Sequence, residues 1–303
     1  MDRYPYAVPY TTNPLVCGPP RIAGARTRRS IYAVEAAIGK TGPAPTQRIE
    51  WLVNGVVTSI RATSDAVFIP DYWDLILDIV KEGTQHLCSD GFTPQPLTIA
   101  DLNPRIPSPD IPCWIPVRRG ETWNVNAALV GIEIPPQAYQ LKLTLDEFLE
   151  APNHDLWVPN ETQFYRVSQV IQPDSDGPAM EIDFQRDGVV TGWRANMRVQ
   201  QPNDWFAVGF DILRNGKDHL VTNGRSAFRL RAMGASVWQG SDVFQPCWYP
   251  VNKHEKWQVF AHNFDAETEK EFAIQLRVEE FTDRGANLFA PGAYQQGIGR
   301  VQG

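Results

Sequence analysis

Residues 71–91 read DYWDLILDIVKEGTQHLCSDG, and residues 204–224 read DWFAVGFDILRNGKDHLVTNG. Both stretches contain the pattern Asp-Ile-x-(Lys/Arg)-x-Gly-x-x-His-Leu, and both close on a glycine. A constant offset of 133 residues separates Asp78 from Asp211 and His86 from His219. An ungapped match of this length indicates an internal duplication, which has to be recognised before the fold is assigned.

The duplication extends in both directions from this stretch. The further matches are WLVNGVVTSIRA (51–62) with FQRDGVVTGWRA (184–195), PCWIPVRRGETWNVNA (112–127) with PCWYPVNKHEKWQVFA (246–261), and LKLTLDEF (141–148) with IQLRVEEF (274–281). The offset is 134 residues in the second of these matches and 133 in the other two. Each copy is therefore as long as a whole domain and far longer than a solenoid repeat.

The extent of the two copies sets the expected domain boundaries. We predict an extended N-terminal arm (1–29), a first domain (30–150), a Pro-bounded linker (151–162), a second domain (163–283) and a Gly-rich C-terminal tail (284–303).

Within each copy the hydrophobic pattern is that of β-strands. Residues 141–145 and 274–278 alternate apolar and polar side chains, as do the segments that follow Trp123 and Trp257. Turn signals separate these segments, at Asn54-Gly55, Asp187-Gly188, Asp90-Gly91, Asn223-Gly224 and Arg119-Gly120. The longest helix-like segment, 71–81, is interrupted by Gly209 in the second copy. Short strands and turns over about 120 residues per unit predict an all-β protein of two tandem antiparallel sandwiches.

Composition excludes several classes of function. The chain has 303 residues and a formal net charge of −7, which argues against nucleic-acid binding by the body of the protein. It has no apolar run near 18 residues, so we expect no membrane insertion, and its N-terminus has no apolar signal core. Of four cysteines, Cys113 and Cys247 occupy equivalent positions beside a tryptophan. We expect these two to be reduced, buried thiols rather than disulfide partners.

Candidate reactive groups have plainer structural explanations. His86 and His219 recur, with Asp78 and Asp211 eight residues earlier, but this is not a compact metal-ligand spacing. We interpret each histidine as packed against a loop whose backbone it hydrogen-bonds. A nucleophilic cysteine in the Pro-Cys-Trp segments has no recurring histidine to activate it.

Two further kinds of active site, a glycosidase-like carboxylate pair and a bicupin metal site, fit the sequence poorly. The recurring acidic pairs at 146–147 and 279–280 could be glycosidase-like carboxylates, but exposed charge at the end of a strand explains them better. A bicupin would need His-x-His motifs, and the chain has none among its five histidines. We therefore predict no catalytic residues, no cofactor and no metal site, and no enzymatic activity.

The N-terminal arm has the composition of an assembly segment. It is Pro-rich and shows neither a strand nor a helix period. Its candidate interface residues are Tyr4, Tyr6, Tyr10, Arg21, Arg26, Arg28 and Arg29. We expect this segment to become ordered against a neighbouring acidic subunit, while packing against its own domain is the alternative.

The repeated features resemble those of the tandem jelly-roll virion proteins of bacteriophages and related viruses. The resemblance depends on the Asn54/Asp187-Gly-Val-Val strand opening, the Asp-Ile-x-(Lys/Arg)-x-Gly-x-x-His-Leu segment, and Pro-Cys-Trp-x-Pro-Val followed by a turn and Trp-x-Val. It covers both copies but neither the arm nor the tail. It implies that each sandwich is a jelly roll.

The resemblance also implies a structural role in a virion, with assembly after synthesis in the host cytoplasm. Two positions in the particle are open, that of a decoration (cement) protein and that of a double jelly-roll major capsid protein. The likeness of the two copies and the arm slightly favour decoration. The expected partners are further copies of the chain, as a homotrimer, and other capsid proteins. A carbohydrate-binding β-sandwich, such as a lectin-like receptor-binding protein, is the alternative.

Overall fold

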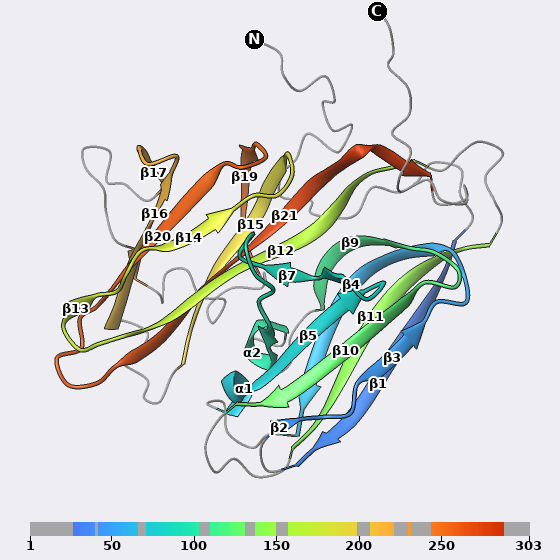
Figure 1. Ribbon diagram of the computed structural model, residues 1–303, viewed down its shortest axis with the longest axis horizontal. Coiled ribbons are helices and arrows are strands. Elements are labelled where there is room, and N and C mark those ends of the chain that lie inside the picture. The colour runs from blue at the N-terminus through green and yellow to red at the C-terminus, as the bar shows by residue number, and fades with distance from the viewer. Residues whose placement is uncertain are drawn as a thin grey trace, which may run out of the picture.

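The computed structural model describes residues 27–39, 42–65, 71–102, 110–130, 137–149, 157–198, 207–220, 230–231 and 244–287. These residues form two groups of antiparallel strands, one from each copy of the repeat (Figure 1). The described part of the chain contains two helices, each four residues long, α1 (Asp71–Asp74) and α2 (Ile99–Leu102). None of the described helices is long or apolar enough to cross a membrane.

The first group of strands forms two sheets around one core. One sheet has the order β1 (Thr27–Ile38), β11 (Gln137–Phe148), β4 (Gly55–Ser64) and β9 (Ile111–Val117). In the other, β10 (Thr122–Leu129) lies between β2 (Gly42–Pro43) with β3 (Gln47–Glu50) and β5 (Leu75–Lys81), which in turn pairs with β6 (Gln85–His86) and β8 (Leu97–Thr98). Early and late strands of the domain are neighbours in both sheets, and this is the jelly-roll arrangement.

The second group repeats this order. Its first sheet runs β19 (Gln245–Val251), β15 (Gly188–Met197), β21 (Lys270–Asn287) and β12 (Trp157–Ile171). In its second sheet, β20 (Lys256–Asn263) pairs with β13 (Ser175–Asp176), β14 (Met180–Asp183) and β16 (Val208–Arg214), and β16 pairs with β17 (Asp218–His219) and β18 (Leu230–Arg231). The chain is a tandem of two jelly rolls.

Strand register confirms the internal duplication residue by residue. Tyr32 lies opposite Leu143 in the first roll, and Tyr165 lies opposite Leu276 in the second, each displaced by 133 positions. Both rolls also contain a β-bulge at the same place, after Val57 in β4 and after Val190 in β15. An irregularity that occurs in both copies at one position indicates that the two rolls share one backbone design.

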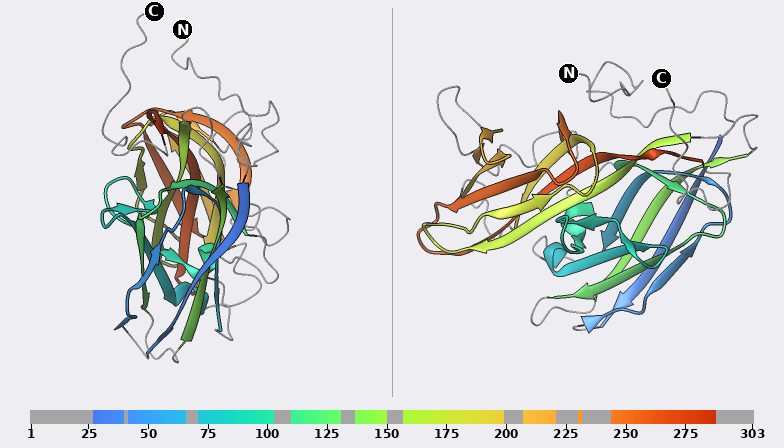
Figure 2. Two further views of the ribbon diagram at one scale, coloured as in Figure 1. Left: turned by 90° about the vertical axis from the view of Figure 1, so that its right-hand side faces the viewer. Right: turned by 45° about the horizontal axis from the view of Figure 1, so that its top comes forward.

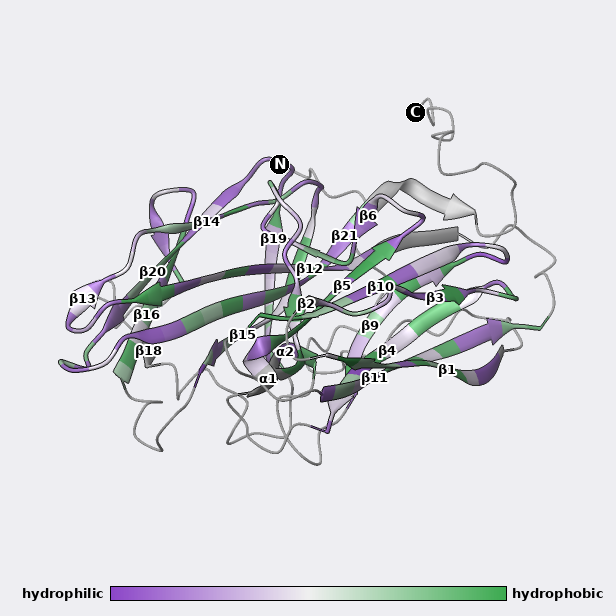
Figure 3. Cartoon of the chain, turned by 60° about the horizontal axis from the view of Figure 1, so that its bottom comes forward, coloured by the Kyte–Doolittle hydropathy of each residue, from purple (hydrophilic) through white to green (hydrophobic). Residues whose placement is uncertain are grey.

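A repeated set of aromatic rings fills the end of each core. In the first roll the ring centroids of Trp51 and Trp123 are 5.1 Å apart in an edge-to-face arrangement. In the second roll Phe184 and Trp257 repeat this contact at 5.3 Å. The indole of Trp123 donates to Glu121, and that of Trp257 donates to Glu255, so both of these N–H groups have an acceptor. Along the long strands, apolar and polar residues alternate as bands of two colours (Figure 3).

Some local features differ from the sequence-based expectations. The helix-like segment 71–81 is helical only over α1, because Leu75, Leu77 and Ile79 point into the core at every second position as strand β5. β1 begins at Thr27, so Arg28 and Arg29 are strand residues, and β12 and β21 extend into the ranges expected for the linker and tail.

Gly55 and Gly188, where the sequence predicts turns, are required for a different physical reason. A Cβ at Gly55 would lie 2.7 Å from the backbone oxygen of Asp146, and one at Gly188 would lie 2.6 Å from that of Glu279. Both glycines therefore allow a close approach of two strands rather than a left-handed turn.

Candidate functional site

The two rolls are joined side by side, and the contact between them is the candidate functional site, here called the junction. Strand β7 (Cys88–Ser89) of the first roll pairs in parallel with β12 of the second, with Cys88 opposite Phe164. The backbone N–H of Phe164 donates to the oxygen of Leu87 at 3.3 Å. The first roll thus adds a strand to a sheet of the second, and α1, α2 and β7 lie between the two groups of strands (Figures 1 and 2).

Asp101, in α2 of the first roll, is the central charged residue of the junction. Its carboxylate accepts from the backbone N–H of Thr98 at 2.8 Å, while the Thr98 hydroxyl accepts from the backbone N–H of Asp101 at 3.1 Å. This reciprocal capping box explains why a single helical turn forms here, and it fixes the carboxylate in place. The same carboxylate faces the second roll, where Arg166 Nε lies 2.9 Å away and Asn196 Nδ2 donates at 2.8 Å.

Arg194, on β15, completes the cluster from the second roll. Its guanidinium donates to the main-chain oxygen of Asp101, and its Nε donates to Gln275 Oε1 at 2.7 Å. Asp101 and Arg194 are both 0% exposed. Burial by itself raises the pKa of Asp101, but Arg166, Arg194 and the hydrogen bonds from Thr98 and Asn196 together outweigh it, so this pKa lies below its ordinary value. Burial lowers the pKa of Arg194, and Asp101 opposes that effect.

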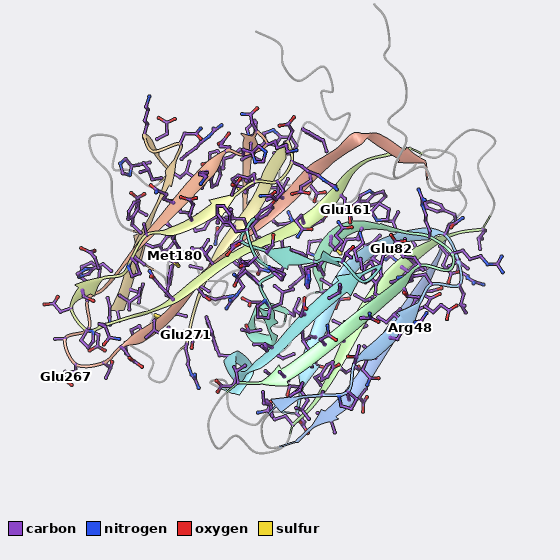
Figure 4. The ribbon with its side chains drawn as sticks, in the orientation of Figure 1. Arg48, Glu82, Glu161, Met180, Glu267 and Glu271 are labelled. Atoms are coloured by element: carbon purple, nitrogen blue, oxygen red, sulfur yellow. The ribbon has the colours of Figure 1, made fainter. Side chains whose placement is uncertain are left out.

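Two more ion pairs flank the cluster. Lys81 of β5 pairs with Glu161 of β12, and both side chains are almost fully buried. Figure 4 labels Glu161 where β12 passes the first roll and Glu267 at the far tip of the second. Arg198, which follows β15, lies 2.6 Å from Asp74 of α1. Each of these ion pairs joins a charge of one roll to an opposite charge of the other, so the two rolls depend on each other.

Apolar and backbone contacts hold the same surfaces together. Phe164 of β12 is 0% exposed and packs in the hydrophobic core of the first roll, where its ring stacks on Phe244 at 6.2 Å. Gly91, in a left-handed conformation with φ of 96°, lies against the second roll. A Cβ there would lie 1.8 Å from the backbone oxygen of Asp183. The Asp90-Gly91 turn predicted from the sequence is thus also a contact of the junction.

The duplication allows each covered surface to be compared with its counterpart. Trp114 of β9 is 7% exposed, because the second roll covers it, and its backbone N–H donates to Thr162 Oγ1 of β12 at 2.7 Å. Its counterpart on β19, Trp248, is 47% exposed. The two tryptophans occupy the same position of equivalent strands, and the buried one lies on the strand that contacts the other roll.

The strand that receives Trp114 has the opposite asymmetry. Residues 161–167 of β12 are all buried, whereas the outward positions of the equivalent strand β1 are exposed. Phe164 corresponds to Ile31, which is 66% exposed. The buried side chains of Arg194 and Gln275 correspond to Arg61 and Lys142, which are half-buried. The face that is buried in the second roll is therefore exposed to solvent in the first roll.

Among the interface residues predicted from the sequence, the structure places Arg28 and Arg29. Both lie on β1 and pair within their own roll, Arg28 Nε with Glu147 and Arg29 Nε with Asp146, each at 2.9 Å. Tyr4, Tyr6, Tyr10, Arg21 and Arg26 lie outside the described residues. The junction residues Asp101, Arg166 and Arg194 were not among the sequence-based candidates.

Each recurring histidine pairs with a carboxylate rather than with the loop backbone that the sequence predicts. His86 Nδ1 donates to Asp78 Oδ1 at 2.8 Å, and His219 Nδ1 pairs with Asp211 in the same way. Each pair links neighbouring antiparallel strands, which is why a carboxylate eight residues away replaces the expected loop backbone. In the part of the chain that the structure describes, no three His, Cys, Asp or Glu side chains gather as metal ligands.

The acidic pairs also differ from the expectation of exposed strand ends. Glu147 and Glu280, at equivalent positions of β11 and β21, are buried. Glu280 accepts from the Tyr165 hydroxyl at 2.5 Å, and burial raises its pKa. Adjacent strand residues point to opposite faces of the sheet, so the two carboxylates of a pair do not converge on one substrate.

The cysteines yield a testable difference between the rolls. Cys113 is buried as expected, whereas Cys247 is only half-buried, with its Sγ 3.5 Å from the main-chain oxygen of Val190. Burial raises the pKa of the Cys113 thiol. We expect iodoacetamide to label Cys247 at least about tenfold faster than Cys113 in native protein, as read by peptide mass mapping. Equal rates in denaturant are the control, and equal native rates would contradict the assignment.

Comparison with known proteins finds similarity among solved structures. No family model matches the chain, and no curated protein does. Among solved structures, the major capsid protein P2 from bacteriophage PM2 matches with a TM-score of 0.43 and 8% identity, over 84% of this chain and 98% of that one. The STIV MCP matches with a TM-score of 0.38 and 8% identity, over 82% and 96%. These TM-scores are below 0.5, so the likenesses do not assign a function by themselves.

Proposed function

We propose that this chain is a structural protein of a virus particle, which forms part of the capsid shell. The observation that supports the proposal is the junction, which joins two rolls of one topology into a single block through buried charge, apolar packing and backbone pairing. Recurring polar pairs such as His86–Asp78 and Trp123–Glu121 hold strands together, so they serve the scaffold.

A shell subunit fits this block better than the decoration protein that the sequence slightly favours. Two alike rolls fixed side by side supply two alike positions in one layer, which is what a tiling shell needs. In double jelly-roll capsid proteins of viruses, three chains with two rolls each form one block. We therefore expect six rolls in a ring. In the same proposal, Arg28, Arg29 and the N-terminal arm contribute contacts to neighbouring subunits.

A carbohydrate-binding role has less support. Among the tryptophans whose exposure the structure describes, Trp248 is the exposed one, and the others are buried or half-buried. A sugar platform usually presents several rings on one face.

The test is the assembly state of the purified full chain. We expect native mass spectrometry to show a trimer, and electron microscopy of the same sample to show a ring of six lobes. A protein that stays monomeric at concentrations of about 50 μM, well above ordinary assembly constants, would overturn the proposal.

A further inference from the structure

We propose that the edge of β19 around Trp248 docks on the outer face of β1, β11 and β4 in a second copy of the chain, and so repeats the junction between subunits. The inference rests on the proposed capsid function and names the surfaces through which subunits meet. The docking edge is Trp248 with its neighbours on β19, and the receiving face is Arg29, Ile31, Ala33, Arg61 and Lys142.

The chain already contains one copy of the proposed contact, in the junction between its two rolls. Inside the chain, β9 of the first roll lies against β12 of the second, with the Trp114 backbone bonded to Thr162. The second roll has a counterpart of the β9 edge in β19, and the first roll has a counterpart of the β12 face around β1. Both counterparts are open, so one further copy of the same contact can form at each end of the chain.

The two exposed surfaces also have the chemistry of a protein–protein interface. Trp248 and Ile31 are large apolar side chains, 47% and 66% exposed, and each lies where its counterpart is buried in the junction. Tryptophan is the residue type most often found at energetic centres of interfaces. Arg29 replaces Thr162, the residue that meets the Trp114 backbone, and a guanidinium there can stack on an indole as a cation–π contact.

The geometry of the two surfaces determines the symmetry of the assembly. The docking edge and the receiving face are different surfaces, so the contact is heterologous and each subunit uses one of each. Repetition of a heterologous contact produces a ring when the rotation closes. Because the internal junction and the new contact have the same form, a closed ring of whole chains contains alternating internal and intersubunit copies of it.

The experiment compares two interface variants with two matched controls. The variants are Trp248→Ala and Ile31→Asp. The controls are Phe264→Ala and Val130→Asp, because Phe264 and Val130 occupy equivalent positions of the two rolls and are exposed in both, so the junction covers neither. Circular dichroism confirms that each variant is folded, and sedimentation velocity measures the subunit dissociation constant.

We expect each interface variant to raise the dissociation constant by at least about 30-fold, the usual effect of losing a central anchor, and the controls to change it less than about threefold. We also expect a 1:1 mixture of Trp248→Ala and Ile31→Asp chains to form heterodimers, since each retains the surface that the other has lost. If both variants assembled as tightly as the wild type, this interface would be overturned and the proposed function would still stand. A mixture without heterodimers would overturn the heterologous arrangement, and a monomeric wild type would overturn both proposals.

Discussion

Replacement of Asp101 by Asn is expected to destabilise the protein by about 3–5 kcal/mol, as expected when one partner of a buried ion pair is removed. The change keeps the shape of the side chain but removes the negative charge between Arg166 and Arg194, which are buried at the junction. Those two cations then repel each other without compensation. Chemical denaturation of the folded chain at pH 7 measures the loss in the free energy of unfolding.

The control for this substitution is Asp110→Asn. Asp110 also pairs with two cations, Lys142 at 2.8 Å and Arg61 at 4.0 Å, but these groups are partly exposed on the receiving face. Solvent weakens such pairs, so we expect a loss of less than about 1 kcal/mol. A loss of the same small size for Asp101→Asn would mean that the junction is not a dry ionic contact.

The pH dependence gives a second readout of Asp101. Because its folded pKa is depressed, its contribution is complete above its unfolded pKa of about 3.9 and is lost as the pH falls through the folded value. The stability difference between wild type and Asp101→Asn should therefore be constant near neutral pH and shrink in acid. A difference that grew on acidification would contradict this sign.

The sequence is sufficient to predict the features that the duplication repeats. Strand alternation identifies β10, β11, β20 and β21, and the repeat aligns Trp123 with Trp257 and His86 with His219 in the structure. These predictions succeed because burial on one face of a strand imposes a period of two, which is visible in any single sequence. The jelly-roll topology itself came from the resemblance and is confirmed by the order of strands in the sheets.

The junction was missed for a physical reason. Its charged residues have no recurring pattern, since Arg166 corresponds to Ala33 and the Asp101 segment lies outside the matched stretches. Nothing local reveals that Asp101 meets Arg166, which is far along the chain. The capping-box spacing of Thr98 and Asp101 is the one signal present in the sequence, and it predicts a helix start rather than a contact. The contrast between Trp114 and Trp248 likewise appears only when the rolls are seen side by side.

Replacement of Phe164 by Ala is expected to cost about 3–5 kcal/mol, the range for truncating a fully buried phenylalanine. Phe164 belongs to a strand of the second roll, but its ring is part of the buried cluster of the first roll, together with Phe244, which the second roll also supplies. The cavity would therefore open inside the junction, where the neighbouring backbone is fixed by pairing between β7 and β12 and cannot collapse easily. Both rolls should lose stability from this single change.

The matched control for Phe164→Ala is Val170→Ala on the same strand. Val170 is 49% exposed and lies beyond the junction, so its truncation should change the free energy of unfolding by less than about 0.5 kcal/mol. Fluorescence of the buried tryptophans follows unfolding, and limited proteolysis reports on each roll separately. If Phe164→Ala loosened only the second roll and left the first at its wild-type stability, the two rolls would be independent domains. The expected loss in both follows from a ring that one roll supplies and the other buries.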